Sequence, residues 1–387
     1  MTVSESIKYV GVNDHEIDLF EGQFEVPLGM AYNSYVILDE KIAVMDTVDR
    51  RFGEEWLKNL RSVLGGRAPD YLVVQHMEPD HSSNILLFRE AFPEAVIVSS
   101  DKAFVMMKNF FGIEKDDKCL VVKEGDVLCL GQHELQFIAA PMVHWPEVIV
   151  TYERSEKLLF SADGFGKFGA NDVEDPEGWA CEARRYYFGI VGKYGAQVQN
   201  LLKKASALEI KTICPLHGPV LKEELGYYLE LYNTWSSYGV ESEGIVVAYT
   251  SVYGNTARAA ALLAQELESR GCPEVELLDL ARTDIYEDVE DAFRYGTLVL
   301  ATTTYNGDIF PFMKQFILHL TERGYRNRKI AFIENGSWAP QAKSIMKKML
   351  ENCKNLSFAE NSVTIMSGVS EKNLEEIKAL ADELMKG

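Results

Sequence analysis

The sequence has no C-x-x-C pair and no excess of positive charge. Its six cysteines are scattered along the chain, which excludes a zinc ribbon or a rubredoxin-type iron site and suits free thiols in a reducing cytoplasm. The 39 Lys and Arg residues against 59 Asp and Glu residues give a net charge of −20. We therefore expect no nucleic-acid partner and no anionic membrane partner. Small molecules and redox proteins remain as the expected partners.

Long apolar runs are also missing. No stretch reaches the roughly 18 to 20 apolar residues that a membrane span needs. The first residues, MTVSESIKYV, lack the basic start and apolar run of a secretory signal. The sequence therefore predicts a cytoplasmic protein. Its 387 residues, 47% apolar and 25% charged, predict a globular chain long enough for two domains.

Short runs rich in β-branched residues dominate the first part of the chain. Between residues 33 and 216 they are SYVIL, KIAVMD, DYLVVQH, EAVIVSS, LQFIAAPMVH, VIVTYE, KLLFSAD and KTICPLH, and the clearest helical segments are EEWLKNLRSVL and SSNILLFREAF. An amphipathic stretch, LKEELGYYLELYNTW, precedes the segment SSYGVESEG, whose composition is typical of a linker. We therefore place a boundary near residue 242, between domains of residues 1–242 and 243–387.

The second part alternates strands with helices or longer connections. Its strands are IVVAYT, VELLDL, TLVLATTT, KIAFIEN and SVTIMSG, and its first helix is TARAAALLAQELESRG. Five strands in this arrangement predict a flavodoxin-like, doubly wound parallel sheet, which binds ligands at the carboxyl ends of its strands. The expected fold class is thus a strand-rich α+β domain followed by an α/β domain.

Potential metal ligands are concentrated in one short segment. The sequence VQHMEPDH leaves an apolar strand and contains His76, Glu78, Asp80 and His81. Alternate side chains of an extended chain point to one side, so His76, Glu78 and Asp80 are expected to converge. His81, at the start of the next helix, is expected to approach from the side. Two imidazoles and two carboxylates can hold parts of two metal ions.

Three further candidates, His144, Asp163 and His217, each follow a predicted strand. Loops after several strands of one sheet gather at one edge, so we expect all seven residues in a single cluster whose central carboxylate bridges two ions. One such histidine alone would more often be an ordinary core residue, whereas the set of seven favours a two-metal site. Trp145 is expected either to wall this site or to pack in the core. Three histidines outside the pattern are predicted to be structural or surface residues: His15, His133 and His319.

A loop rich in hydroxyl groups follows the first strand of the second part and runs into an Ala-rich helix. Backbone N–H groups at a strand-to-helix turn bind anions, and hydroxyl groups add neutral donors. The loop has neither the G-x-G-x-x-G nor the G-x-x-x-x-G-K-[ST] pattern, so it suits a terminal phosphate monoester. Its residues are Thr250, Ser251, Val252, Tyr253, Gly254, Asn255 and Thr256.

Two more loops at strand ends have small polar residues and an aromatic side chain. A flavin ring needs an apolar face and polar groups along its pyrimidine edge, which Tyr305, Trp338 and the neighbouring main chain could supply. The three loops resemble the loops of flavodoxins that bind flavin mononucleotide (FMN), and this favours a flavin site over plain helix caps. The two further loops are Thr302, Thr303, Thr304, Tyr305, Asn306 and Gly307, and Asn335, Gly336, Ser337 and Trp338.

The metal segment resembles the H-x-H-x-D-H signature of the metallo-β-lactamase fold, with Glu78 in place of the second histidine. With the SVYGNT and TTTYNGD loops in the second half, the sequence resembles flavodiiron proteins over essentially the whole chain. The resemblance implies a metallo-β-lactamase-like αββα sandwich, a flavodoxin-like domain, FMN and two iron ions. An added carboxylate suits redox-active iron better than zinc. The implied ligands are His76, Glu78 and His144 on one iron, Asp80, His81 and His217 on the other, and Asp163 bridging both.

The function implied by the resemblance is reduction of dioxygen to water, of nitric oxide to nitrous oxide, or of both, at an iron pair fed by FMN. The sequence ends after LEEIKALADELMKG with no rubredoxin-like or flavin-reductase module, so electrons are expected from a separate donor such as rubredoxin or a reduced cofactor. A head-to-tail homodimer, or a dimer of such dimers, is also implied.

Two alternatives stay open at this stage. A binuclear metal hydrolase of the same fold would have no use for a flavin domain and usually has histidine where this chain has Glu78. An electron-transfer flavoprotein without gas reduction would be expected to have lost some of the seven ligands. Iron analysis of the purified protein would separate these readings.

Overall fold

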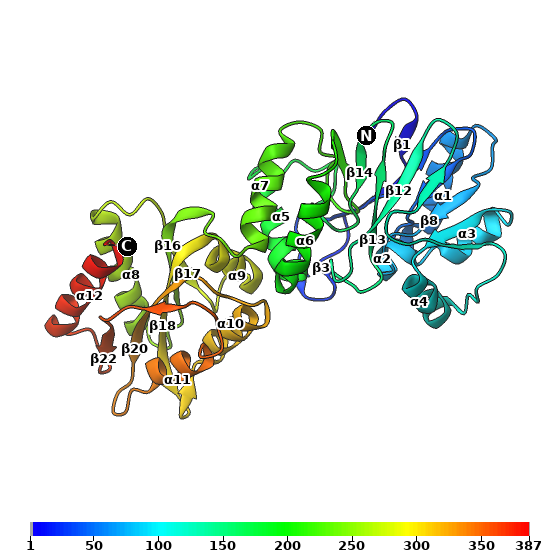
Figure 1. Ribbon diagram of the computed structural model, residues 1–387. Helices are drawn as coiled ribbons and strands as arrows, with labels where there is room; N and C mark the ends of the chain where they lie inside the picture. The colour runs from blue at the N-terminus through cyan, green and yellow to red at the C-terminus, as the bar shows by residue number, and fades with distance from the viewer. Residues whose placement is uncertain (1–2, 387) are drawn as a thin grey trace. The chain divides into compact units, whose positions relative to one another are not determined.

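A computed structural model describes residues 3–386, in which the chain divides into two units (Figure 1). One unit comprises the described residues up to Tyr187 together with Tyr194–Asn233, and the other comprises Phe188–Lys193 and the described residues from Thr234 onward. The change of unit at 233/234 lies a few residues before the predicted boundary near residue 242, which stays a prediction. Every helix of residues 3–386 is too short or too polar to span a lipid bilayer.

Two sheets enclose the core of the first unit. The first has the order β1 (Ile7–Tyr9), β6 (Tyr35–Ile37), β7 (Ala43–Met45), β8 (Tyr71–Val73), β9 (Val96–Ser99) and β10 (Cys119–Val121). The second has the order β11 (Val127–Cys129), β12 (Glu134–Ala139), β13 (Ile149–Glu153), β14 (Leu158–Phe160) and β15 (Thr212–Cys214). Two short antiparallel pairs accompany them: β2 (Val12–Asp14) with β5 (Met30–Tyr32), and β3 (Leu19–Phe20) with β4 (Phe24–Glu25).

Side chains from both sheets form one apolar core. Val73 and Val98 of the first sheet and Phe137 and Phe160 of the second belong to the same buried cluster. β-branched and aromatic side chains fit a pleated, buried surface, and for this reason the apolar runs of the sequence become strands here. In the first sheet β7, β8, β9 and β10 are parallel, and in the second β14 and β15 are parallel.

Helices cover the outer faces of the two sheets (Figure 1). On one side lie α1 (Gly53–Leu64), α3 (Ile85–Ala91) and α4 (Asp101–Phe111), and on the other lie α5 (Trp179–Tyr186), α6 (Gly195–Ala205) and α7 (Leu225–Ser236). The apolar stripe of α1 buries Trp56, Leu60 and Leu64, and Gly65 ends the helix in the left-handed conformation. The predicted αββα sandwich is confirmed.

The second unit is a parallel sheet with helices on both faces. Its strand order is β17 (Val275–Asp279), β16 (Ser242–Tyr249), β18 (Tyr295–Tyr305), β20 (Lys329–Asn335) and β21 (Ser357–Phe358); β22 (Val363–Ile365) also pairs with β20, and the short β19 (Asp308–Ile309) with β18. Numbered along the chain, the order is 2-1-3-4-5, as predicted for a flavodoxin-like sheet.

The helices of this unit pack in two groups. α8 (Asn255–Ser269) packs against α12 (Glu371–Leu384). On the other face α10 (Pro311–Glu322) contacts both α9 (Ile285–Arg294) and α11 (Ala342–Met349) (Figure 1). The buried stripe of α8 contains Ala259, Ala260, Leu263 and Leu267, which is the face expected from its periodicity.

Two local predictions near the metal segment are wrong. The segment from His76 to Asp80 is not extended, because β8 ends at Val73 and Pro79–Ser82 form a short helix, α2. Pro79 has a fixed φ and no N–H group, and it occupies the first turn of that helix. The run expected to end at His144 also stops early, since β12 ends at Ala139 and the following Pro141 cannot donate a ladder hydrogen bond.

Candidate metal centre and flavin site

The seven predicted metal ligands lie in loops that follow strands of the first unit. His76 and Glu78 lie between β8 and α2, and Asp80 and His81 lie on α2. The remaining three follow β12, β14 and β15: His144, Asp163 and His217. The short helix, rather than an extended chain, turns Asp80 and His81 away from His76 and Glu78. The structure thereby gathers the seven side chains into two groups of potential ligands.

The first group consists of His76, Glu78, His144 and Asp163, which can bring one ligand atom each within 4.8 Å of one another. His144 Nε2 lies 3.0 Å from Glu78 Oε2 and 3.2 Å from Asp163 Oδ2. His76 Nε2 lies 3.3 Å and 3.2 Å from the same two oxygens. Metal–ligand distances of about 2.0–2.2 Å place neighbouring ligands of one ion about 3 Å apart, so the spacing suits a single ion.

The second group consists of Asp80, His81 and His217. The two imidazole nitrogens, His81 Nε2 and His217 Nε2, are 3.0 Å apart. Asp80 Oδ2 lies 3.2 Å from the former and 3.3 Å from the latter. Two ring nitrogens and one carboxylate oxygen that converge in this way form three corners of a metal coordination shell.

Asp163 lies between the groups and faces both. Its Oδ2 is directed to His76 and His144, and its Oδ1 lies 3.3 Å from His81 Nε2 and 3.8 Å from His217 Nε2. The side chain is fully buried, and among residues 3–386 neither of its oxygens accepts a hydrogen bond. Buried carboxylate oxygens without donors are costly, and two metal ions would satisfy both of them. The residues present therefore fit a pair of ions bridged by Asp163.

Protonation equilibria reflect this concentration of charge. Burial opposes ionisation of Asp163, but the adjacent imidazoles of His76 and His144 hold its pKa well below the usual range. Burial, with Glu78 and Asp163 nearby, raises the pKa of Asp80 to about 7. Burial, together with the nearby His76 imidazole, lowers the pKa of His217 and thereby favours the uncharged ring. The opposing shifts of neighbouring groups are typical of a functional site.

Three groups behind the ligands fix their orientation. Glu147 Oε1 lies 2.8 Å from His76 Nδ1 and accepts a hydrogen bond from the Met77 N–H at 2.9 Å. The His217 Nδ1–H group donates to the Ala31 carbonyl at 2.8 Å. Asp46 accepts from the backbone N–H of Gln75 and from its side-chain amide. The sequence analysis missed Glu147 and Asp46, although each lies within a few residues of a strand end.

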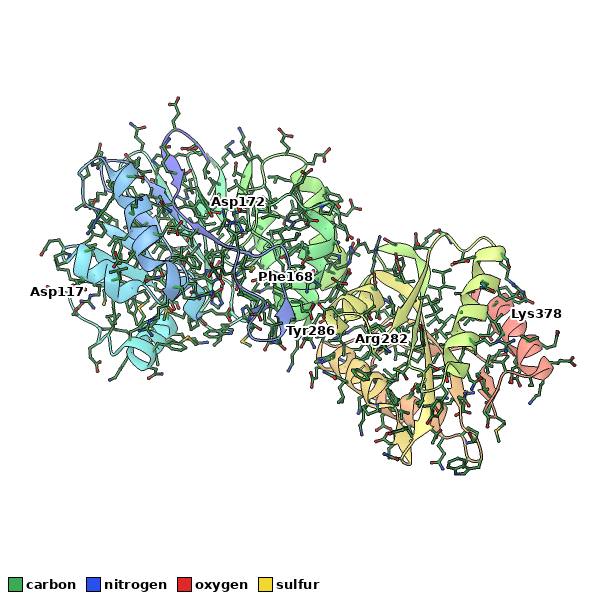
Figure 2. All side chains as sticks on the ribbon, turned by 180° about the vertical axis from the view of Figure 1, so that it is seen from behind. Asp117, Phe168, Asp172, Arg282, Tyr286 and Lys378 are labelled. Atoms are coloured by element: carbon green, nitrogen blue, oxygen red, sulfur yellow. The ribbon has the colours of Figure 1, made fainter. Side chains whose placement is uncertain are left out.

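Aromatic rings surround the cluster. The half-buried Trp145 packs edge-on against the His76 imidazole at 5.3 Å and against the His144 ring at 6.0 Å, so it walls the site. His217 has Phe20, Tyr32 and Tyr186 around it, at ring distances of 5.4, 5.9 and 5.5 Å. Phe20 packs edge-on against Phe168, which is labelled in Figure 2, at a ring distance of 5.7 Å. These rings limit the exposure of the ligands and pack against the imidazoles.

One carboxylate at the edge of the cluster also escaped the sequence analysis. Glu21 lies in the turn between β3 and β4. Although the Glu21 side chain is exposed, partial desolvation and the charge of Glu78 raise its pKa to about 7. Loss of a proton from Glu21 is therefore disfavoured by the neighbouring predicted ligand.

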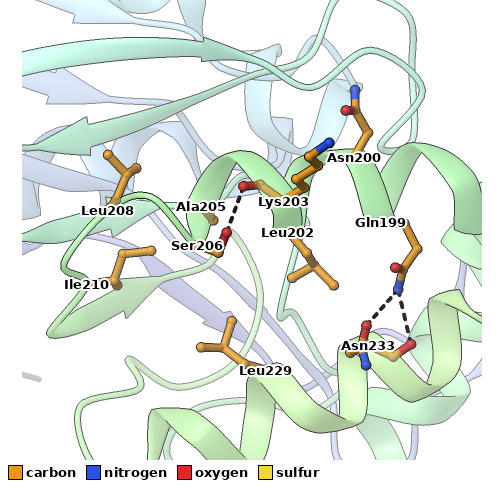
Figure 3. A pocket seen from close by; sticks show the side chains of 10 residues that line it. All are labelled: Gln199, Asn200, Leu202, Lys203, Ala205, Ser206, Leu208, Ile210, Leu229 and Asn233. Carbon is orange, nitrogen blue, oxygen red and sulfur yellow. Dashed lines mark hydrogen bonds between the residues drawn. The ribbon is translucent and has the colours of Figure 1, made fainter.

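A separate hollow of about 810 Å³ lies between α6 and α7 (Figure 3). Leu202, Ile210 and Leu229 point into it, and the Gln199 side-chain amide donates to the Asn233 side chain at 2.9 Å on its border. Its lining contains none of the seven predicted ligands. The hollow is therefore distinct from the metal cluster.

The second unit has a smaller hollow, of about 180 Å³, at the carboxyl ends of its strands. The first predicted flavin loop leads into α8 through Gly254, which has the left-handed conformation. Ser251 Oγ accepts a hydrogen bond from the Gly254 N–H at 3.0 Å. The residues around this hollow are Ser251, Val252, Tyr253, Asn255, Thr256, Thr303, Asn335, Ser337 and Ser367. Eight of these nine belong to the predicted loops.

Ser367 is the lining residue that the sequence analysis missed. It follows β22 and has a φ of 70°, and its carbonyl accepts a hydrogen bond from the Asn335 amide at 3.2 Å. The same amide donates to Thr256 Oγ1 at 3.3 Å. The rule that binding loops follow parallel strands also applies to β22 and would have found this loop.

The other predicted flavin residues have different surroundings. Thr250 and Thr302 are fully buried, and their hydroxyl groups bond to each other at 2.6 Å. Thr304 Oγ1 accepts from backbone N–H groups at the start of α11. Tyr305 ends β18, Asn306 and Gly307 form the turn before β19, and Gly336 precedes Ser337. Trp338 and Tyr253 are 88% and 91% exposed, which leaves both rings accessible to a planar ligand.

Comparisons with known proteins match both units. A family model described as ODP family beta lactamase matches residues 30–218, and one described as Flavodoxin domain matches residues 246–375. The chain is 31% identical over 374 residues to a nitric oxide reductase of Moorella thermoacetica, covering 94% of this chain and 93% of that protein.

Solved structures resemble the whole chain. The flavodiiron protein of Giardia intestinalis matches with a TM-score of 0.91 and 28% identity, over 98% of this chain and 94% of that one. The rubredoxin oxygen:oxidoreductase of Desulfovibrio gigas matches with a TM-score of 0.92 over 100% and 98% of the two chains; at 24% identity this likeness concerns the fold alone.

Proposed function

The chain belongs to the flavodiiron protein family, and we propose that it reduces dioxygen to water, nitric oxide to nitrous oxide, or both, with FMN and a pair of iron ions as cofactors. The observation that carries the proposal is the position of Asp163 between two groups of potential ligands. The relatives named nitric oxide reductase and oxygen oxidoreductase act on the same two gases.

The proposed ligands are those expected from the sequence. His76, Glu78 and His144 would hold one iron, Asp80, His81 and His217 the other, and Asp163 both. The spacing of about 3 Å between neighbouring ligand atoms supports this assignment, as do the buried oxygens of Asp163, which accept no hydrogen bond within residues 3–386. Two redox-active irons and one FMN together store four electrons, which is the number that dioxygen needs to become water.

The protein side chains control access and orientation. Trp145, Tyr186 and Phe20 keep water from the ligand cluster, and the Ala31 carbonyl and Glu147 direct the coordinating nitrogens of His217 and His76 toward its centre. The ring nitrogen that donates to a neighbouring acceptor cannot also bind metal, so these contacts select Nε2 as the ligand atom in both residues.

The proposed FMN site lies at the carboxyl end of the second unit. The loop from Thr250 to Thr256, ahead of α8, would bind the phosphate through backbone N–H and hydroxyl groups. The exposed Trp338 and Tyr305, and also the exposed Tyr253, would contact the flavin ring. The hollow at this end supports the assignment because Ser251, Thr256 and Asn335 line it together.

We also propose an external electron donor, such as a rubredoxin or a reduced cofactor, and a head-to-tail homodimer or a dimer of such dimers. The family resemblance supports both.

Activity with NADH alone should be nearly absent and should appear on addition of a rubredoxin with its reductase. Light scattering at assay concentration should give at least twice the chain mass of 43.6 kDa, and a fully active monomer would contradict the dimer. The cytoplasmic location stays a prediction.

The experiment that tests the function measures consumption of dioxygen and of nitric oxide by one preparation loaded with iron and FMN and supplied with a chemically reduced donor. At least one gas should be consumed, and nitric oxide should yield nitrous oxide. Stoichiometric zinc with full gas-reducing activity, or iron- and FMN-loaded protein that consumes neither gas, would overturn the proposal. The ratio of the two rates gives the preferred gas.

A further inference from the structure

We infer that Glu147 makes the two halves of the proposed iron site electronically unequal, so that the iron held by His76 is the harder of the two to reduce. The inference rests on the proposed function and assigns a positioning and tuning role to a residue outside the coordination shell. It concerns the order in which the two irons accept electrons.

The contact between Glu147 and His76 is short and shielded from solvent. Both side chains are fully buried, and Glu147 Oε1 lies 2.8 Å from His76 Nδ1. A carboxylate only accepts hydrogen bonds, so Nδ1 carries the proton and Nε2 presents its lone pair to the ligand cluster. The same oxygen accepts from the Met77 N–H at 2.9 Å, which fixes the carboxylate against the loop that carries His76.

The other three imidazoles have no such partner among residues 3–386. His217 Nδ1 donates to the neutral Ala31 carbonyl. His81 Nδ1 is buried without a hydrogen-bond partner, and the ion pairs of His144 involve only its Nε2. Asp46, another buried carboxylate nearby, accepts from main-chain N–H groups and the Gln75 amide rather than from an imidazole.

The remaining ligand charges are balanced. Each half has two imidazoles and one carboxylate of its own, Glu78 in one and Asp80 in the other, and the two halves share Asp163. Two further carboxylates lie nearby: Glu21 beside Glu78, and Asp46, whose charge acts on His81. Within residues 3–386 neither is hydrogen-bonded to an imidazole, so Glu147 is the carboxylate that adds its charge directly behind an imidazole ligand, and it does so in one half only. Its second oxygen, Oε2, is buried without a donor, so hydrogen bonds do not fully neutralise that charge.

A negative charge behind an imidazole stabilises the more positive state of the metal that the imidazole binds. A carboxylate partner also increases the basicity of the imidazole ligand, and the low dielectric of a buried site strengthens both effects. The iron bound by His76 should therefore stay ferric when the first electron enters, and the iron bound by His81 and His217 should take that electron.

The test is a redox titration of the iron- and FMN-loaded protein, followed by the mixed-valence EPR signal and by Mössbauer spectra, for the wild type and Glu147→Gln. Glutamine retains an acceptor for the Nδ1–H group but removes the charge. In Glu147→Gln the second one-electron potential, that of the iron held by His76, should be higher by at least about 59 mV, which corresponds to a tenfold change in the ratio of oxidised to reduced iron at fixed potential. The first one-electron potential should be unchanged. The two potentials then lie closer together, so the maximal mixed-valence signal should be smaller than in the wild type.

Two variants serve as controls. Glu153→Gln removes another fully buried carboxylate. Glu153 is the last residue of β13 and accepts hydrogen bonds from the N–H groups of Ser155 and Glu156. This variant should leave both potentials unchanged. Glu147→Asp retains the charge and should retain most of the separation between the potentials, which loss of packing alone would not predict.

The shifts of the two potentials and the iron content of Glu147→Gln decide between a tuning role and a purely structural role of Glu147. Equal shifts of both potentials in Glu147→Gln, or none, would overturn the inference while the proposed function stands. Selective loss of one iron per chain would overturn it, because Glu147 would then be needed to hold that iron rather than to set its potential. Loss of both irons from a folded variant would overturn it. Wild-type protein that binds no iron would overturn the proposed function and the inference together.

Discussion

Asp163 is the side chain that the two groups of candidate ligands share. Replacing it with asparagine retains the shape but removes the charge and one of the two acceptors. Wild-type protein should contain about two irons per chain, the number for a two-metal site, and we expect the Asp163→Asn variant to contain less than one. Bound FMN should be unchanged, because the flavin loops belong to the other unit. Metal analysis and the flavin absorbance of the same sample measure both quantities.

The matched control is Asp172→Asn. Asp172 lies at the surface of the same unit, where its side chain is 58% exposed and pairs with the exposed His15 (Figure 2). This variant should retain both irons. Full iron occupancy in Asp163→Asn would show that the bridging role is assigned to the wrong residue.

The proposed phosphate loop gives a second prediction at the residue scale. Ser251→Ala and Thr256→Ala each remove one hydroxyl beside the hollow. A hydrogen bond to a charged group contributes about 1.5–3 kcal/mol, so each variant should bind FMN about 10- to 100-fold more weakly. Fluorescence titration of the flavin-free protein with FMN measures the change.

Ser269→Ala is the control for this loop. Ser269 lies at the other end of α8 and donates to the Glu266 carbonyl at 2.8 Å, so its loss should not change the FMN dissociation constant. If the alanine variants at positions 251 and 256 bind FMN like wild type, or if the extracted flavin is mostly FAD, the phosphate loop is misassigned.

Single residues differ in how far the sequence predicts them. His76, Asp163 and His217 can be predicted because each is a metal-binding residue type directly beyond an apolar run, and such loops meet at one sheet edge. Glu147 cannot be found in this way, because its role depends on a contact with a residue 71 positions away. Sequence spacing contains no information on which carboxylate faces which imidazole.

At the scale of elements, one buried histidine connects four loops at the opposite end of the sandwich from the metal cluster. His133, before β12, pairs through Nδ1 with Asp39 at 2.7 Å and through Nε2 with Glu156 at 3.3 Å. Glu156 also accepts from Ser4 and Ser6, which precede β1. The cluster thus fastens the N-terminal strand to the turns after β6 and before β12 and β14, and His133 has the structural role that the sequence predicts.

This cluster should make stability depend on pH. Burial opposes the charge on His133, but Asp39 and Glu156 raise its pKa. Hydrogen bonds from His133 lower the pKa of Asp39 against the effect of burial, and hydrogen bonds from Ser6, Ser4 and His133 do the same for Glu156. The histidine contribution is fully present below its unfolded pKa of about 6.5 and is lost as pH rises through the raised value. The carboxylate contributions are present above about pH 4 and are lost as pH falls through the lowered values.

Urea unfolding of wild type and His133→Gln measures this effect. The difference in free energy of unfolding should be largest between about pH 4.3 and 6.5 and should shrink toward pH 9. His15→Gln, which removes a half-exposed histidine, should show no comparable pH dependence. A constant difference across this range for His133→Gln would contradict the role given to the ion pairs.

Elements as a whole are predicted better than their ends. The apolar runs become strands, but these strands end before His76 and His144: β8 stops at Val73, ahead of the helix that Pro79 begins, and β12 stops at Ala139, just before Pro141. The helix expected from Leu221 begins at Leu225. Helix α4 falls outside the clearest periodic segments of the sequence. Its position depends on packing against the sandwich, which local periodicity does not record.

At the scale of the whole molecule, the order of the two units could be predicted from the change of pattern along the chain. The alternation of strands and helices after residue 242 predicts a flavodoxin-like, doubly wound sheet, and the structure has the order 2-1-3-4-5. The αββα sandwich of the first part is implied by the family resemblance that its metal segment carries. The pairing of sheet neighbours such as β14 with β15, which are about fifty residues apart, depends on packing.

The central claim is that gas reduction ends at the iron pair and not at the flavin. Free reduced flavin gives peroxide with dioxygen, whereas the irons and FMN together can deliver four electrons. An oxygen electrode, run on the iron- and FMN-loaded protein with its donor, tests this directly through addition of catalase after the dioxygen is consumed. The account predicts that catalase returns no dioxygen from the intact enzyme, whereas variants at His81 or His217 stop or begin to release peroxide. Return of half of the consumed dioxygen from the intact enzyme would contradict it.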